Sequence, residues 1–272
     1  MSRSAAGRPL SFATAARAVF ALSLEGMLWT RRSLVMSVLL GLPVLFAVLY
    51  RVTLAARLPA SLSALDLYGS IVALYYVRNA VPLAALFYAT ALIADEVEQK
   101  TITHLFTRPI TRASILFGKF AAYAATTVSL ALPALAISFF LLTSADGLEG
   151  VRAAVGHLPR DMGVVALGFL AYGALFTLLG VALRRPVIPG LVFLFLWELL
   201  VNMPGELPRL TITAWLRSLL LHRPVEDGLL ARIFTPGVLP AGASLAVLVL
   251  VTGACLALAA VAFSRREYVL EQ

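Results

Sequence analysis

Residues 241–263 read AGASLAVLVLVTGACLALAAVAF, an apolar run with no charged side chain. A helix needs roughly 20 mostly apolar residues to cross a hydrocarbon core of about 30 Å, and this run meets that requirement. The whole chain follows the same trend, since 61% of its 272 residues are hydrophobic and 13% are charged. Soluble domains carry about twice that charged fraction. The sequence therefore predicts an all-α integral membrane protein.

Working outward from this run, we predict six transmembrane helices in a single permease-sized domain, residues 1–272. The fifth is short and carries Glu198, which makes it the weakest of the six. The predicted spans are Leu34 to Tyr50, Tyr68 to Ala94, Phe120 to Leu142, Met162 to Leu183, Val187 to Met203 and Ala241 to Phe263.

The basic residues orient these spans. The net charge of +8 lies in short clusters between apolar runs, not along one polar face, which argues against nucleic acid as a partner. Thirteen of the 22 basic residues and six of the 14 acids fall on one predicted side, a net +7, against +1 on the other. Lysine and arginine favour the cytoplasmic side. We therefore expect both termini in the cytoplasm, with a bacterial inner membrane as the default location.

Three segments lie outside the spans. Residues 1–32 form a predicted cytoplasmic N-terminus with an interfacial helix over Leu10 to Arg32, and an extended first span is the alternative. Residues 204–240 form an outer loop with short interfacial helices, and 264–272 a cytoplasmic tail. Apolar residues support both helix predictions: Phe12, Ala16, Val19, Phe20, Met27 and Leu28 in the first, and Trp215, Leu216, Leu219, Leu220 and Leu221 in the second.

The connection between the second and third spans, residues 95–119, is the most informative for function. Three acids and Lys100 follow the second span directly, and Thr101 can cap a short helix. Ile102, Leu105 and Phe106 recur at helical spacing and share one face. Pro109 ends this turn, and a new helix is expected to begin near Thr111 and continue into the third span.

This apolar face on the cytoplasmic side has two readings. If this face stays exposed to water, the protein loses the stabilisation of about 1.5–3 kcal/mol that burying each large apolar side chain would give. A groove on a partner protein would cover it, or it could pack beneath its own bundle. The residues alone leave both open.

The run Glu96-x-Glu98-x-Lys100-Thr101-x-x-x-Leu105-x-x-x-Pro109-Ile110-Thr111-Arg112-x-x-x-Leu116-x-Gly118-Lys119 resembles the conserved cytoplasmic segment of ABC-2 type transporter permeases. That pattern reads approximately E-x-E-x-G-T-x-x-x-L-x-x-x-P-[IV]-[ST]-R-x-x-[IL]-x-x-G-K. Lys100 stands where the family usually has glycine. The six spans, the interfacial helix and the outer loop are also similar to that family.

The resemblance implies a membrane permease of an ABC transporter, whose coupling helix docks on a separate ATPase. It also implies transport in the exporting direction, which most of the family takes. By motif match, Ile102, Leu105 and Phe106 would dock, while Glu96, Glu98 and Arg112 would position the segment. ATP and magnesium would bind the partner, with no cofactor on this chain. A second permease subunit, identical or related, is implied, together with membrane lipid around both.

The chain itself has no phosphate-binding loop, which requires G-x-x-x-x-G-K-[ST]. Gly118-Lys119 is followed by Phe120 and has no glycine five positions earlier. We therefore expect this chain not to be an enzyme, and no cysteine or histidine spacing indicates a metal site.

Charged and polar residues within the spans are the candidates for a translocation pathway, because burying them in a membrane is costly. Glu198, with Asn202 one turn on, is the first, and its alternative is an outer-interface position beside Trp197. Arg78 and Asn79 are the second. About 24 Å separates Arg78 from the inner end of its span, so it could instead extend to the outer interface.

Two rival classes stay open. One is an integral-membrane enzyme acting on lipid-linked substrates, since Asp227-Gly228-x-x-Ala231-Arg232 resembles half of the CDP-alcohol phosphatidyltransferase signature. The positions of its glycine and two metal-binding aspartates hold Ala241, Leu245 and Val249 here. The other is a non-transporting membrane scaffold or sensor subunit. An ATPase encoded by the neighbouring gene would favour transport over both, whereas the substrate cannot be read from the sequence.

Overall fold

The computed structural model describes residues 11–28, 30–56, 63–92, 111–183, 185–197, 200, 207–221 and 240–265. Within these ranges the regular structure is helical throughout, as predicted, and no strand occurs. The main helices are α1 (Phe12–Leu28), α2 (Arg31–Ala55), α3 (Ala64–Ser70), the π-helix η1 (Ile71–Ala80), α4 (Val81–Ala89), α7 (Arg112–Thr143), α8 (Gly147–Ala154), α9 (Leu158–Ala182), α10 (Val187–Trp197), α11 (Ile212–Leu219) and α13 (Ala241–Arg265).

Five of the predicted spans are present as helices long and apolar enough to cross a membrane. They are α2, the continuous helix Ala64–Ala89 formed by α3, η1 and α4, then α7, α9 and α13. The fifth predicted span corresponds to α10, whose 11 described residues end at Trp197. The rest of that span lies almost wholly outside the described residues, so a sixth crossing stays a prediction.

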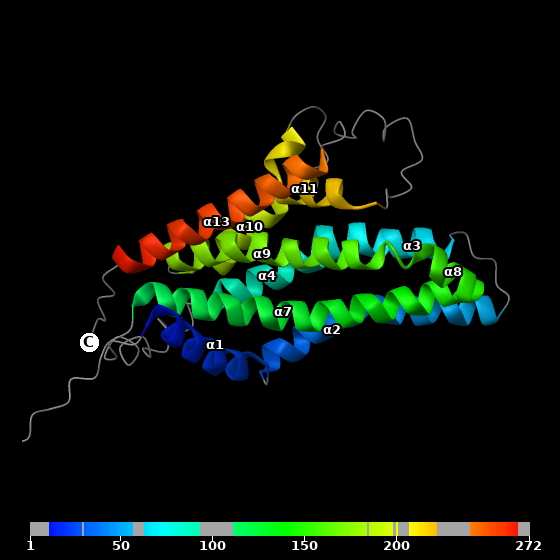
Figure 1. The fold of residues 1–272 in the computed structure, drawn as a ribbon, viewed down its shortest axis with the longest axis horizontal. Helices are drawn as coiled ribbons and strands as arrows, with labels where there is room; N and C mark the ends of the chain where they lie inside the picture. The colour runs from blue at the N-terminus through cyan, green and yellow to red at the C-terminus, as the bar shows by residue number, and fades with distance from the viewer. Residues whose placement is uncertain are drawn as a thin grey trace, which may run out of the picture.

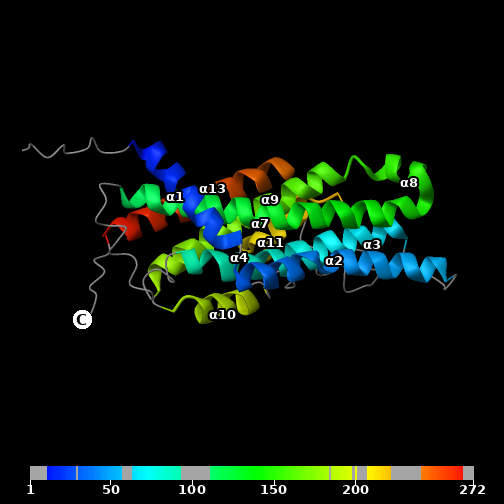
Figure 2. The ribbon, with the colours of Figure 1, turned by 90° about the horizontal axis from the view of Figure 1, so that it is seen from below.

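The long helices lie side by side along the longest axis of the molecule (Figures 1 and 2). The second span and α9 are the most buried helices, with fully buried Tyr76, Tyr172 and Phe176 between them and their neighbours. α2 and α13 flank this centre, and most of their large apolar side chains face outward. α1 and α2 pack against α7, α13 packs against α9, and α10 packs against α4.

The N-terminal region forms two helices and not one extended span. α1 ends at Leu28, and the hydroxyl of Thr30 accepts a hydrogen bond from the backbone N–H of Ser33 at the start of α2. A threonine in this position satisfies an N–H group that the first helical turn leaves without a partner. The separate helix predicted from the spacing of apolar residues is therefore present, while its place at a membrane interface stays a prediction.

A proline in α2 is accommodated by tyrosines of the second span. Pro43 has no N–H to donate to the Leu39 carbonyl one turn earlier. The Tyr75 hydroxyl donates to that carbonyl, and the Tyr76 hydroxyl donates to the Leu40 carbonyl at 2.7 Å. A backbone group left unpaired in hydrocarbon costs several kcal/mol, so the bond from Tyr75 to Leu39 fixes where α2 meets the second span, and the bond from Tyr76 adds to it.

The π-helix in the second span also has a proline beside it. η1 ends at Ala80, and Val81 donates its N–H to the Tyr76 carbonyl, five residues back. Pro82 follows immediately and cannot donate to the carbonyl of the preceding turn. The proline ring also clashes with that carbonyl, and a wider helix upstream of the proline relieves the clash without interrupting the span. Such π-segments frequently occur at functional sites.

The short helix predicted around Trp215 is confirmed as α11, which is more enclosed than a surface helix. Thr213 and Leu216 are fully buried. The Thr213 hydroxyl hydrogen bonds the Tyr172 hydroxyl of α9 at 2.7 Å, and the Ser218 hydroxyl bonds the Ser244 hydroxyl of α13 at 2.6 Å. α11 therefore packs against both α9 and α13.

Candidate coupling site

The predicted coupling segment joins two elements that the structure describes, the end of the second span at Leu92 and the start of α7. Its central residues lie outside the described part of the chain, so their roles in docking and in positioning the segment stay predictions. These are Glu96, Glu98, Lys100, Thr101, Ile102, Leu105, Phe106 and Pro109. What the structure describes is how the C-terminal end of the segment, the start of α7, is attached to the rest of the bundle.

The first attachment is a lysine of the sequence motif. Lys119 is 8% exposed, and its Nζ donates a hydrogen bond of 2.9 Å to the Leu92 carbonyl oxygen. Hydrogen bonds to charged groups are stronger than neutral ones. Lys119 therefore binds the last described turn of the second span to α7.

The same end of the second span is held from its other side by α9. A Cβ atom built on Gly180 would lie 2.8 Å from the Thr90 carbonyl oxygen, closer than real Cβ atoms approach. Glycine at this position allows the two backbones to meet. Thr90 is fully buried, and its hydroxyl donates to the Leu86 carbonyl at 2.5 Å. The end of the second span is therefore held between α7 and α9.

The second attachment is Arg112, the first residue of α7. Thr111 caps this helix by accepting a hydrogen bond from the Ser114 N–H at 3.4 Å, and the expected helix start near Thr111 is thereby confirmed. The Arg112 Nη1 donates to the carbonyls of Phe263 and Ser264 at 3.4 and 3.2 Å. These carbonyls belong to the last turn of α13, where a cation is favoured. Arg112 therefore links the start of α7 to the end of the last span.

The glycine of the motif brings α1 onto the same region of α7. A Cβ on Gly118 would lie 2.6 Å from the Ala16 carbonyl oxygen and 2.9 Å from the Val19 Cβ. The Phe12 and Phe117 rings pack edge to face with centroids 6.1 Å apart. Gly118 and Lys119 thus attach α7 to two different elements, α1 and the second span.

The two candidate pathway residues that the structure describes lie on the π-helix and not at this site. Glu198 and Asn202 lie outside the described residues. Arg78 and Asn79 fall on the π-helix, where Asn79 donates its Nδ2 hydrogen to the Leu74 carbonyl at 2.6 Å. The Asn79 amide therefore bonds to the backbone of its own π-helix. Arg78 is half-buried and makes no hydrogen bond or ion pair with another described residue.

Two features escaped the sequence analysis. Gly118 and Lys119 were part of the sequence motif, but their partners could not be inferred from it. Ala16, which contacts Gly118, and Leu92, which accepts from Lys119, are both distant along the chain. Asp161 is the other: it is fully buried beside Tyr68 at the start of α9. An acid directly before a predicted span, which begins at Met162, was the available signal for it.

Five described helices that are long and apolar enough to cross a membrane define the class as a polytopic membrane protein. The sequence model of the ABC-2 family transporter proteins matches residues 30–268, which is most of the chain. The chain therefore belongs to the ABC-2 transporter family. α1 precedes the matched range. No match was found among curated proteins.

Proposed function

We propose that this chain is the membrane permease subunit of an ABC transporter and that residues 95–119 couple it to a separate ATPase subunit. The observation that carries the proposal is that two cations at the C-terminal end of this segment bind other spans: the buried Lys119 binds the Leu92 carbonyl of the second span, and the half-buried Arg112 binds the last turn of α13. Membership of the ABC-2 family supports it, since such transporters typically work with an ATPase.

The attachments explain how force could pass from the segment into the membrane. Displacing the segment pulls on the end of the second span through Leu92 and on α13 through Arg112. α7 moves with both, because each cation is carried by its first turns. A packed bundle shifts as discrete elements and does not deform continuously. Closure of the ATPase would in this way change how three of the spans pack.

The proposed assembly contains two permease subunits in a bacterial inner membrane, with both chain termini in the cytoplasm and transport in the exporting direction. The outward apolar side chains of α2 and α13, among them Leu34 at 68% and Leu250 at 71% exposure, support burial by lipid and a second subunit. ATP and magnesium would bind the partner ATPase, and this chain would perform no catalysis.

The test replaces Leu105 and Phe106 by aspartate in a full-length chain expressed with the ATPase of the neighbouring gene. We expect loss of the stable complex and of stimulated ATP hydrolysis, because charge at these positions abolishes an apolar contact. Leu148→Asp is the matched control, since Leu148 is an exposed leucine of α8 at the opposite end of α7. Unchanged assembly and stimulation in the double variant would reject the coupling role.

A further inference from the structure

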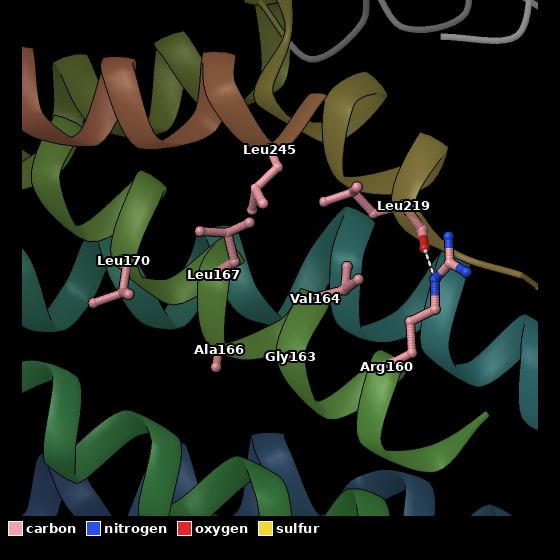
Figure 3. A pocket seen from close by; sticks show the side chains of 8 residues that line it. All are labelled: Arg160, Gly163, Val164, Ala166, Leu167, Leu170, Leu219 and Leu245. Carbon is pink, nitrogen blue, oxygen red and sulfur yellow. Dashed lines mark hydrogen bonds between the residues drawn. The ribbon is translucent and has the colours of Figure 1, made fainter. Parts of the chain in front are cut away.

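An apolar groove of about 420 Å³ opens between α9, α11 and α13, away from the coupling site (Figure 3). Leu167 and Leu170 line it from α9, Leu219 from α11 and Leu245 from α13. Arg160 is the only charged residue among the side chains that line it, and it lies at one end. Its volume is in the range of cavities that hold small molecules.

Arg160 is held in a fixed place with part of its guanidinium available. Its Nε donates to the Leu219 carbonyl at 2.7 Å, and Figure 3 shows the two terminal nitrogens on the side of Arg160 away from Leu167 and Leu245. Neither terminal nitrogen bonds another described residue. The neighbouring acid, Asp161, is buried beside Tyr68, and the exposed Glu149 pairs with Arg152.

The dimensions of the groove match one leaflet of a bilayer. Arg160 lies in the first turn of α9, and Leu170 follows ten residues later, which is about 15 Å along a helix. Half of a hydrocarbon core of about 30 Å is the same length. A molecule with its charge at Arg160 and its chain along α9 would end near the middle of the membrane.

We infer that this groove binds one acyl chain of an anionic phospholipid, whose phosphate is bound by Arg160. The apolar lining excludes a soluble anion as the main occupant, because most of the contact surface would gain nothing from it. The guanidinium provides two parallel N–H donors that suit phosphate oxygens. The lipid stabilises the contacts of α11 with α9 and α13, since all three helices line the groove.

Two variants test the inference by native mass spectrometry of the full chain in detergent with phosphatidylglycerol. Arg160→Gln removes the charge, and Gly163→Leu fills the groove, since Gly163 lines it and a Cβ there meets nothing within 4 Å. We expect each to weaken phosphatidylglycerol binding about tenfold, the loss that one charge-assisted contact or one blocked chain would cause. Arg152→Gln and Gly253→Leu are the matched controls, the latter because a Cβ at Gly253 also meets nothing.

The same titration includes phosphatidylcholine and glycerol phosphate. Phosphatidylcholine should bind the wild type more weakly, and glycerol phosphate should not displace phosphatidylglycerol at equal concentration. Equal affinity in the wild type and both variants would overturn the inference, as would displacement by glycerol phosphate. A Gly163→Leu chain whose only change is a different oligomeric state would show that a second copy covers the groove. None of these readouts depends on ATP hydrolysis, so the inference can fail while the proposed coupling holds.

Discussion

Replacing Lys119 by methionine tests the attachment between α7 and the second span. Methionine keeps an apolar stem of similar length and removes the cation that donates to Leu92. A hydrogen bond to a charged group contributes about 1.5–3 kcal/mol, and the site is almost fully buried, so solvent does not offset the loss. This corresponds to roughly 10- to 100-fold easier opening of the last turn before Leu92.

Amide hydrogen exchange read by mass spectrometry measures that opening directly. Residues 86–92 should exchange about 10- to 100-fold faster in Lys119→Met, while the centre of α9 keeps its protection. The ATPase should still bind, because the docking residues are intact, but its stimulation should fall. Arg152→Met is the control, since Arg152 is exposed and its pair with Glu149 is expected to contribute little. A folded Lys119→Met chain with unchanged exchange at 86–92 would refute the reasoning.

Three further substitutions test the attachments and the fold. Gly118→Val should lower the thermal midpoint and weaken the packing of α1 on α7, because its Cβ would enter contacts of 2.6–2.9 Å that cost about 1–3 kcal/mol. Gly253→Val should do neither, because a Cβ there meets nothing within 4 Å. Tyr76→Phe should cost about 0.5–1.5 kcal/mol in denaturant unfolding, because it removes a buried hydrogen bond to the Leu40 carbonyl of α2; an unchanged free energy of unfolding would contradict this. Arg112→Gln should accelerate exchange at the end of α13 and leave the second span unchanged, and equal effects at both would disprove a separate attachment.

Local patterns predicted much of this fold. The apolar runs located five long helices, and Thr111 marked the start of α7 because a capping side chain acts on residues close to it in sequence. The separate helix α1 and the short helix α11 followed from the spacing of apolar residues.

The features that the sequence did not reveal depend on tertiary contacts. The bond from Lys119 to Leu92 joins residues 27 positions apart, and the bond from Arg112 to Phe263 joins residues 151 apart. Neither partner is identifiable before the helices are placed, since any terminal carbonyl could accept. The π-helix likewise combines a proline with the packing of its own span, and propensity alone does not specify that outcome.

The central claim, that residues 95–119 meet a separate ATPase, is tested most directly by site-specific cross-linking. Cys255 is the only cysteine, so a Cys255→Ala background allows a single cysteine to be placed at Leu105 and, as a control, at Arg152. With a short bifunctional reagent in native membranes, position 105 should cross-link to the ATPase of the neighbouring gene and position 152 should not. A cross-link from position 105 only into its own chain, in membranes where that ATPase is present, would contradict the account.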